Sequence, residues 1–296
     1  MIIDLKKSGI IHKIVQQNLK AELKNFNSAL EIVLFIENQI LNLTKFDKFN
    51  PLQSGIAFPV GISINDIAAH FTPDKNNNPK INNDDIIKID FGVHINGYIT
   101  DGAISYCPSG KYNELIKISE NATNIGIKHS GPDAVLGDIG GYIQEYIESK
   151  EIVIDNKLHQ IKSVYELTGH NIAPYIIHKD KAVPNIKIPY YERMLEDEVY
   201  AIETFPTTGS GHIKSLNECS HFMIESKNVT NFTDDKVKQI FDIRKTLAFC
   251  PRWFDFEIPE CQTITKYPIL KTIDKGLVAQ YEKTIYIKNN CIEILN

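Results

Sequence analysis

Two aspartates on either side of an expected β-hairpin are the first residues of this sequence that could do chemistry together. The segment IIKIDFGVHINGYITDGAISY has two β-rich runs around Asn96-Gly97, a pair typical of two-residue hairpin turns. With that turn Gly92 faces Asp101, and Asp90 lies on the same face, so the two aspartate Cα atoms are about 7–8 Å apart. Two carboxylates at this distance could hold a pair of divalent metal ions, because without a cation they would repel each other.

Other acids and histidines stand in β-rich or glycine-flanked settings. Glu203 lies in VYAIETF, where a strand buried on both faces would not normally carry a carboxylate, and Glu282 lies in LVAQYEKTIYI. His170 follows a Thr-Gly pair, His178 ends YIIH, and His70 ends GISINDIAAH. Each has a simpler interpretation on its own, as an exposed acid or as a core or surface histidine. Taken together, oxygen ligands with one imidazole suit manganese, iron, cobalt or zinc.

The composition narrows the classes of protein. The chain of 296 residues has a hydrophobic share of 43%, typical of a globular protein, and its net charge of -5 argues against nucleic acid as a partner. The N-terminal residues lack the apolar core of a signal peptide, and no stretch approaches the ~20 apolar residues of a membrane helix. The five cysteines are scattered and never form a CxxC pair, which argues against structural disulfides and against a thiolate zinc site. This pattern fits a protein of the reducing cytoplasm.

Hydrophobic periodicity indicates the elements that must position the chemical residues. Residues 1 to about 45 have an apolar stripe at helical spacing, although Glu37 falls within that stripe. The Asn-rich segment 74–85 is too polar for the core. Together these patterns indicate a mixed domain with antiparallel strands and a partly helical insertion. We expect further helices at 111–130, 132–149 and 233–248, and strands at 198–205 and 277–288.

The strings KIDFGVHINGYITD, LTGHNIAPYIIH, AIETF and AQYEKT resemble the metal-binding motifs of methionine aminopeptidases. AFPVGISINDIAAHFTPD is similar to the substrate-histidine segment of that family, and the match runs from about residue 55 to 290. The resemblance implies an α+β pita-bread (creatinase/aminopeptidase) fold, with a curved antiparallel sheet flanked by helices, in one catalytic domain over residues 1–296. It also implies two divalent metal ions (cobalt, manganese, iron or zinc), held by Asp90, Asp101, His170, Glu203 and Glu282.

The subtype resembles type 2. Between Glu203 and Glu282 lie 78 residues, more than type 1 enzymes have, and ECSHFM and TLAFCPRW resemble the type 2 helical insertion, expected at about 219–266. The layout is similar to a minimal, archaeal-like enzyme without a long charged N-terminal extension. Two features depart from the family pattern. Lys283 follows Glu282 where the family usually has histidine, and the segment after Trp253 is shorter.

The resemblance also implies roles for individual residues. Asp90 would bind one metal ion, Asp101 and Glu282 would bridge both, and His170 and Glu203 would complete the other. Glu203 would also accept a proton, His178 would polarise the scissile carbonyl, and His70 would lie at the amide nitrogen of the second residue. The implied substrate site comprises Phe58, His70, Ile177, His178, Phe205, His221, Ala248 and Tyr267.

The implied activity is metal-dependent removal of the initiator methionine from nascent proteins whose second residue is small. The expected enzyme is a cytoplasmic monomer that acts on N-terminal methionine peptides, with ribosome proximity left open. Two alternatives share the fold. A prolidase or aminopeptidase P usually carries a separate N-terminal domain, for which the 89 residues before Asp90 leave little room. A non-catalytic binding protein would have lost ligands, and all five are present.

Overall fold

The computed structural model describes residues 2–225 and 234–296. No helix within these ranges has both the length and the apolar character needed to cross a membrane. The α-helices are α1 (Ile2–Glu22), α2 (Ala29–Thr44), α3 (Asn113–Lys128), α4 (Leu136–Glu148) and α5 (Asp235–Arg244), and short 3-10 helices cover Leu23–Asn25 and Pro251–Trp253.

Three antiparallel sheets carry the residues of interest. One contains β1 (Ser54–Ile56), β2 (Gly61–Ile64), β4 (Ile87–Ile95) and β5 (Tyr98–Tyr106). A second has the order β10 (Ala182–Pro184), β9 (Thr168–Ile172), β11 (Val199–Thr204), β15 (Tyr281–Ile287) and β16 (Ile292–Ile294). The third has the order β13 (Ile213–Ile224), β14 (Ile264–Thr272) and β3 (Ile67–Ala69). Two small pairs complete the strands: β6 (Glu151–Ile154) with β7 (Lys157–Gln160), and β8 (Lys162–Ser163) with β12 (Pro206–Thr207).

The hairpin of β4 and β5 has the register expected from its turn. Gly92 pairs with Asp101, and Asp90 pairs with Ala103. Both turn residues have positive φ, 50° at Asn96 and 81° at Gly97, as the tight hairpin turn requires. The prediction that the two aspartates share one face of the hairpin is confirmed, because side chains alternate along a strand.

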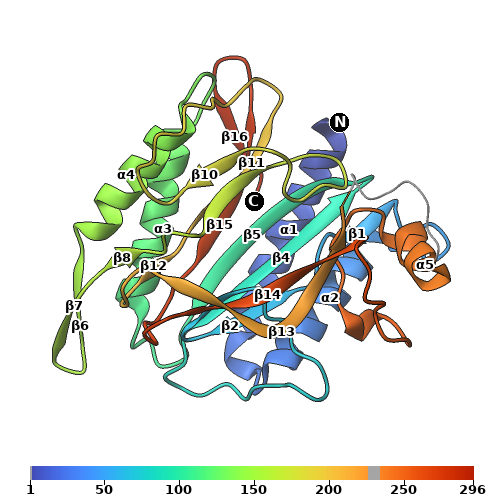
Figure 1. Ribbon diagram of the computed structural model, residues 1–296, viewed down its shortest axis with the longest axis horizontal. Coiled ribbons are helices and arrows are strands. Elements are labelled where there is room, and N and C mark those ends of the chain that lie inside the picture. The colour runs from blue at the N-terminus through green and yellow to red at the C-terminus, as the bar shows by residue number, and fades with distance from the viewer. Residues whose placement is uncertain (1, 226–233) are drawn as a thin grey trace.

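Helices cover the two larger sheets. Apolar residues of α3 and α4 pack in one core cluster with Tyr200 and Ile202 of β11 and Ile285 of β15. Residues of α1 and α2 form a second cluster with β2 and β4, including Ile89 and Phe91. Figure 1 shows α3 and α4 beside the second sheet, and α1 and α2 behind the hairpin. The sheet surfaces opposite these helices are left free to line a cavity.

The expected helices are present with shifted ends. Helix α4 begins at Leu136 instead of Pro132, because Asp133 has a positive φ of 62° and the N-cap residue Val135 is extended. The segment at about 219–266, expected to be a helical insertion, starts in β13 and ends in β14. Its helical content within the described residues is α5 and the short 3-10 helix. The segment is therefore an excursion between two paired strands, and its residues 226–233 lie outside the described ranges.

Candidate metal centre

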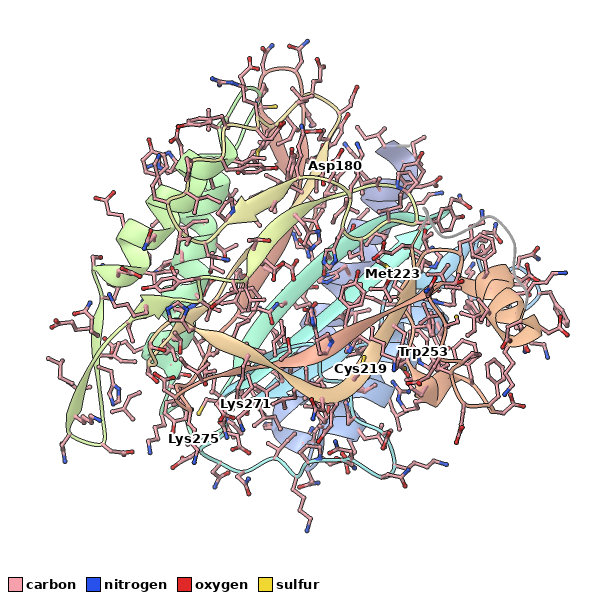
Figure 2. All side chains as sticks on the ribbon, in the orientation of Figure 1. Asp180, Cys219, Met223, Trp253, Lys271 and Lys275 are labelled. Carbon is pink, nitrogen blue, oxygen red and sulfur yellow. The ribbon has the colours of Figure 1, made fainter. Side chains whose placement is uncertain are left out.

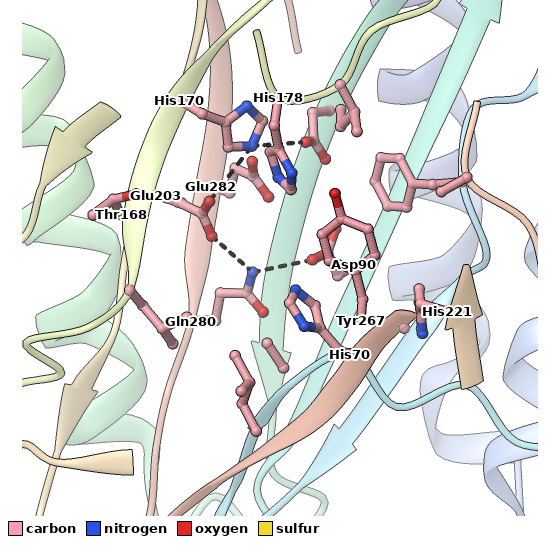
Figure 3. Close-up of a pocket in the computed structure, with 18 of the residues that line it drawn as sticks. His70, Asp90, Thr168, His170, His178, Glu203, His221, Tyr267, Gln280 and Glu282 are labelled. Carbon is pink, nitrogen blue, oxygen red and sulfur yellow. Dashed lines mark hydrogen bonds and ion pairs between the residues drawn. The ribbon is translucent and has the colours of Figure 1, made fainter. Parts of the chain in front are cut away.

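Strand register brings three of the expected ligands to one face of the second sheet. Glu203 on β11 lies directly opposite Glu282 on β15. His170 on β9 lies opposite Ala201, two residues before Glu203 and hence on the same face. All three side chains therefore point into the same space (Figure 3).

The hairpin supplies the two aspartates from the other side of this space. Strands β5 and β15 lie side by side, because the Thr284 hydroxyl accepts a hydrogen bond from the Asp101 backbone N–H and donates one to the Asp101 carbonyl, at 2.8 and 2.7 Å. The Asn296 side chain also donates to that carbonyl at 2.7 Å. These bonds fix the Asp101 backbone next to the strand that carries Glu282.

The five side chains converge within short distances. His170 Nε2 lies 3.7 Å from Asp101 Oδ2 and 3.6 Å from Glu203 Oε1. Asp101, His170 and Glu282 each offer a ligand atom, and these three atoms lie within 4.8 Å of one another. The side chain of Gln280 links Asp90 to Glu203, since its amide nitrogen lies 3.2 Å from Asp90 Oδ2 and 3.4 Å from Glu203 Oε2 (Figure 3).

The four carboxyl groups of the cluster are stable as anions only next to positive charge. Desolvation raises the pKa of Asp90 to about 7, and desolvation together with the neighbouring carboxylates raises the pKa values of Asp101, Glu203 and Glu282 well above their ordinary range. One oxygen each of Asp90, Asp101 and Glu282 is buried without a hydrogen-bond partner among the described residues. Such oxygens are costly unless a cation binds them. Four carboxylates and one imidazole therefore fit two divalent metal ions in both charge and donor type.

Neutral histidines border the metal centre. The ring centroid of His178 lies 4.2 Å from that of His170, and that of His70 lies 5.7 Å from the Tyr267 ring. Desolvation by the surrounding protein lowers the pKa of His178 to about 4, although its side chain is open to the cavity, and it lowers the pKa of His70 as well. Both rings are neutral at physiological pH and can donate a hydrogen bond without carrying charge.

The backbone also singles out His70. It has a positive φ of 66°, which is uncommon for a residue other than glycine and is often found at functional sites. Its Nδ1 lies 3.3 Å from the Pro268 carbonyl, so Nδ1 carries the proton that is donated there. The other nitrogen, Nε2, is then an acceptor.

One cavity of about 500 Å³ contains the whole expected site. All five expected ligands and all eight expected substrate-site residues line it. Its lining includes the apolar side chains of Phe58, Ile177 and Ala248. It also includes His221 on β13, which lies opposite Tyr267 on β14. The glycine at position 92 makes room for this lining, since a Cβ there would lie 2.3 Å from the Phe58 ring.

Sequence reasoning missed some residues of the cavity. Gln280 contacts two expected ligands, and the signal that could have revealed it is its position two residues before Glu282. Met223 and Leu270 also line the cavity, although an apolar residue on a strand gives no sign of this. Lys283 lies on the opposite face from Glu282, where its ammonium group donates to the Asn296 backbone oxygen at 2.6 Å. The lysine that stands where the family usually has histidine therefore points away from the ligands.

Comparison with known proteins shows the family of the chain. The model of metallopeptidase family M24 matches residues 4–289. Methionine aminopeptidase 2 of Dictyostelium discoideum is 38% identical over 308 residues, which cover 99% of this chain and 70% of that protein. Methionine aminopeptidase 2 of Komagataella phaffii is 35% identical over 312 residues, which cover 99% and 69%.

Solved structures with low sequence identity share the fold. A methionine aminopeptidase from Thermotoga maritima superposes with a TM-score of 0.67 at 19% identity, covering 99% of this chain and 95% of that one. A thermophilic Arx1 superposes with a TM-score of 0.78 at 15% identity, covering 99% and 90%. The expected pita-bread fold is thereby confirmed. With a family model that spans nearly the whole chain and relatives above one third identity, the chain belongs to metallopeptidase family M24, among the type 2 methionine aminopeptidases.

Proposed function

We propose that this protein is a metal-dependent aminopeptidase that removes an N-terminal methionine when the second residue is small. The observation that carries the proposal is that one cavity is lined by the five expected ligands and also by an apolar cluster that includes Phe58, Ile177 and Ala248. A metallopeptidase needs a charged centre for hydrolysis, and a methionine-specific one also needs a hydrophobic pocket of limited size beside it.

The residues that would hold two divalent ions are Asp90, Asp101, His170, Glu203 and Glu282. When bound, such ions polarise a carbonyl and lower the pKa of water enough to form a nucleophile at neutral pH.

The chain's own residues position the reactants and move the proton. The carboxylate of Glu203 accepts the proton of the attacking water. Gln280 donates to Glu203 and to Asp90, which holds both carboxylates in orientation. His178 donates a hydrogen bond to the oxygen of the scissile carbonyl, where negative charge develops, and His70 faces the amide nitrogen. Because both imidazoles are neutral, neither repels the cations.

The apolar residues that line the cavity would bind the methionine side chain. Phe58, Ile177 and Ala248 pack in one apolar cluster with Met223, and the Tyr267 ring packs against that cluster. An apolar wall of this kind suits a flexible thioether. Both nitrogens of His221 already have partners, Pro59 O and Ser220 Oγ, each at 3.2 Å. His221 therefore contributes the face of its ring to the pocket.

We further infer that the protein acts as a monomer in the cytoplasm, on nascent chains. All five cysteines are free thiols in the structure, which suits a reducing compartment.

Peptide hydrolysis tests the proposal directly. Purified protein loaded with manganese or cobalt should release methionine from Met-Ala-Ser, and it should act poorly on Leu-Ala-Ser and Met-Lys-Ser. Chelated protein and Asp101→Asn serve as controls that lack the metal centre. Equal rates on the three peptides would contradict the proposed specificity, and preferential cleavage of dipeptides with proline at the second position would favour a prolidase.

A further inference from the structure

We propose that Arg244 is a positioning residue for substrate specificity, because its guanidinium group ties together two walls of the methionine pocket. This inference rests on the proposed function of that pocket. Arg244 does not line the cavity and would not touch the substrate. It would act through the backbone of the residues that do.

The contacts of Arg244 join segments that are far apart in the sequence. Arg244 is the last residue of α5, and its Nη2 donates hydrogen bonds to the Ala57 carbonyl at 3.0 Å and to the Ala248 carbonyl at 2.7 Å. Ala57 immediately precedes Phe58, and Ala248 itself lines the cavity. One charged group therefore sets the separation between the Phe58 wall and the Ala248 wall.

The residues just after Arg244 also contact the segment that carries Ile177, a third part of the cavity lining. Thr246, two residues after Arg244, donates a hydrogen bond from its hydroxyl to the Tyr175 carbonyl at 2.5 Å. Tyr175 lies two residues before Ile177, and its N–H donates to Gly97 in the hairpin turn. Arg244 and Thr246 thus contact the backbone next to Phe58 and next to Ile177, and the same segment contains Ala248.

A group of buried contacts holds Arg244 in place. Its guanidinium lies over the Trp253 ring at 4.8 Å, and the Trp253 indole N–H donates to Glu37 at 3.0 Å. Arg252 binds Glu37 with two hydrogen bonds, at 2.8 and 2.7 Å. Glu37, which interrupts the apolar stripe of α2, is thus the buried acid that anchors this segment to the helix. Figure 2 shows Trp253 and Met223 on the same side of the molecule, near β13.

The chemistry at this position calls for arginine. Desolvation lowers the pKa of Arg244 to about 10, so the group remains charged at neutral pH. A planar guanidinium can donate in two fixed directions from one nitrogen and can also stack on an indole ring. A lysine ammonium has neither the planar shape nor the stacking surface, so Arg244→Lys should keep the charge and only part of the geometry.

Steady-state kinetics of Arg244→Met and Arg244→Lys test the inference. With Met-Ala-Ser, we expect the KM of Arg244→Met to rise by about tenfold, the scale of one misplaced pocket contact, with a smaller change in kcat. The preference for Met-Ala-Ser over Leu-Ala-Ser should narrow, and Arg244→Lys should lie between this variant and the wild type. The metal content should equal that of the wild type.

Arg193→Met is the matched control, since it removes an exposed arginine that also donates to a backbone carbonyl, that of Asp133 at 2.6 Å, and that does not line the cavity. The Met-to-Leu preference of this variant should stay at the wild-type value. Wild-type kinetics in Arg244→Met, or an equal loss of preference in Arg193→Met, would overturn the inference. If Arg244→Met fails to fold, the same criteria apply to Arg244→Lys. A wild-type enzyme without methionine preference would instead count against the proposed function.

Discussion

Glu203 and Glu282 lie directly opposite each other on neighbouring antiparallel strands. Like charges at opposed positions destabilise a sheet, and both side chains here are also largely removed from water. The repulsion is relieved when a cation binds or when a carboxyl group takes up a proton. The pair therefore ties the stability of the second sheet to metal binding.

Metal removal should abolish turnover, and Asp101→Asn should reduce both metal content and turnover. Asp101 contributes one of three ligand atoms that lie within 4.8 Å of one another. Its substitution should therefore lower metal affinity and turnover by more than the roughly 10–100-fold typical for a residue that only hydrogen-bonds to a ligand. Elemental analysis beside the rate on Met-Ala-Ser checks this. Asp84→Asn, at an exposed carboxylate, is the control and should behave as wild type. Full activity after exhaustive chelation would rule out the metal mechanism.

The metal-free protein should lose stability as pH rises. The folded-state pKa of Asp90 is raised from 3.8 to about 7, so its contribution to stability is complete below pH ~4 and is lost as pH rises towards 7. In EDTA, Asp90→Asn should therefore have a Tm close to that of wild type at pH 4 and a higher Tm at pH 7. Thermal unfolding at several pH values measures this difference. A lower Tm for Asp90→Asn at pH 7 would contradict it.

The histidines should separate into one ligand and two residues that act on the substrate. His170→Ala should lose metal together with activity. His178→Ala and His70→Ala should both keep the wild-type metal content. His178→Ala should lose about 10²–10³ in rate, as expected when one preorganised donor is removed. His70→Ala should also lose rate, because Nε2 no longer accepts a hydrogen bond from the substrate amide N–H. His159→Ala, on the β6–β7 hairpin, is the control. Loss of a metal ion from His178→Ala or His70→Ala would show that the ligand assignment is wrong, and wild-type rates in both would make them structural.

Gln280 should orient ligands without binding metal. Gln280→Leu has nearly the same volume and removes the donor shared by Asp90 and Glu203. We expect kcat to fall by roughly tenfold or more, since a hydrogen bond to a charged group contributes about 1.5–3 kcal/mol. The metal content should remain close to two ions per chain. Measuring kcat together with metal stoichiometry distinguishes this role from that of a ligand. A loss of metal from Gln280→Leu would show that Gln280 is itself a ligand.

Local features of the site could be predicted from the sequence because they depend on nearby residues. The Asn96-Gly97 turn sets the register of its own hairpin, and that register places Asp90 and Asp101 on one face. The strings around His170, Glu203 and Glu282 resemble known motifs closely enough to indicate the ligand set. Turn geometry and strand alternation are short-range effects, so the amino-acid sequence determines them.

Long-range relationships required the tertiary structure. The opposition of Glu203 and Glu282, and the single Gln280 side chain that spans Asp90 and Glu203, depend on how strands from distant parts of the chain pair and pack. Glu37 falls within the apolar stripe of its helix because its buried side chain binds Arg252 and Trp253, which lie more than 200 residues away in the sequence. Hydrophobic periodicity reports which face of an element is buried, whereas the identity of the contacting residue depends on the packing of the whole fold.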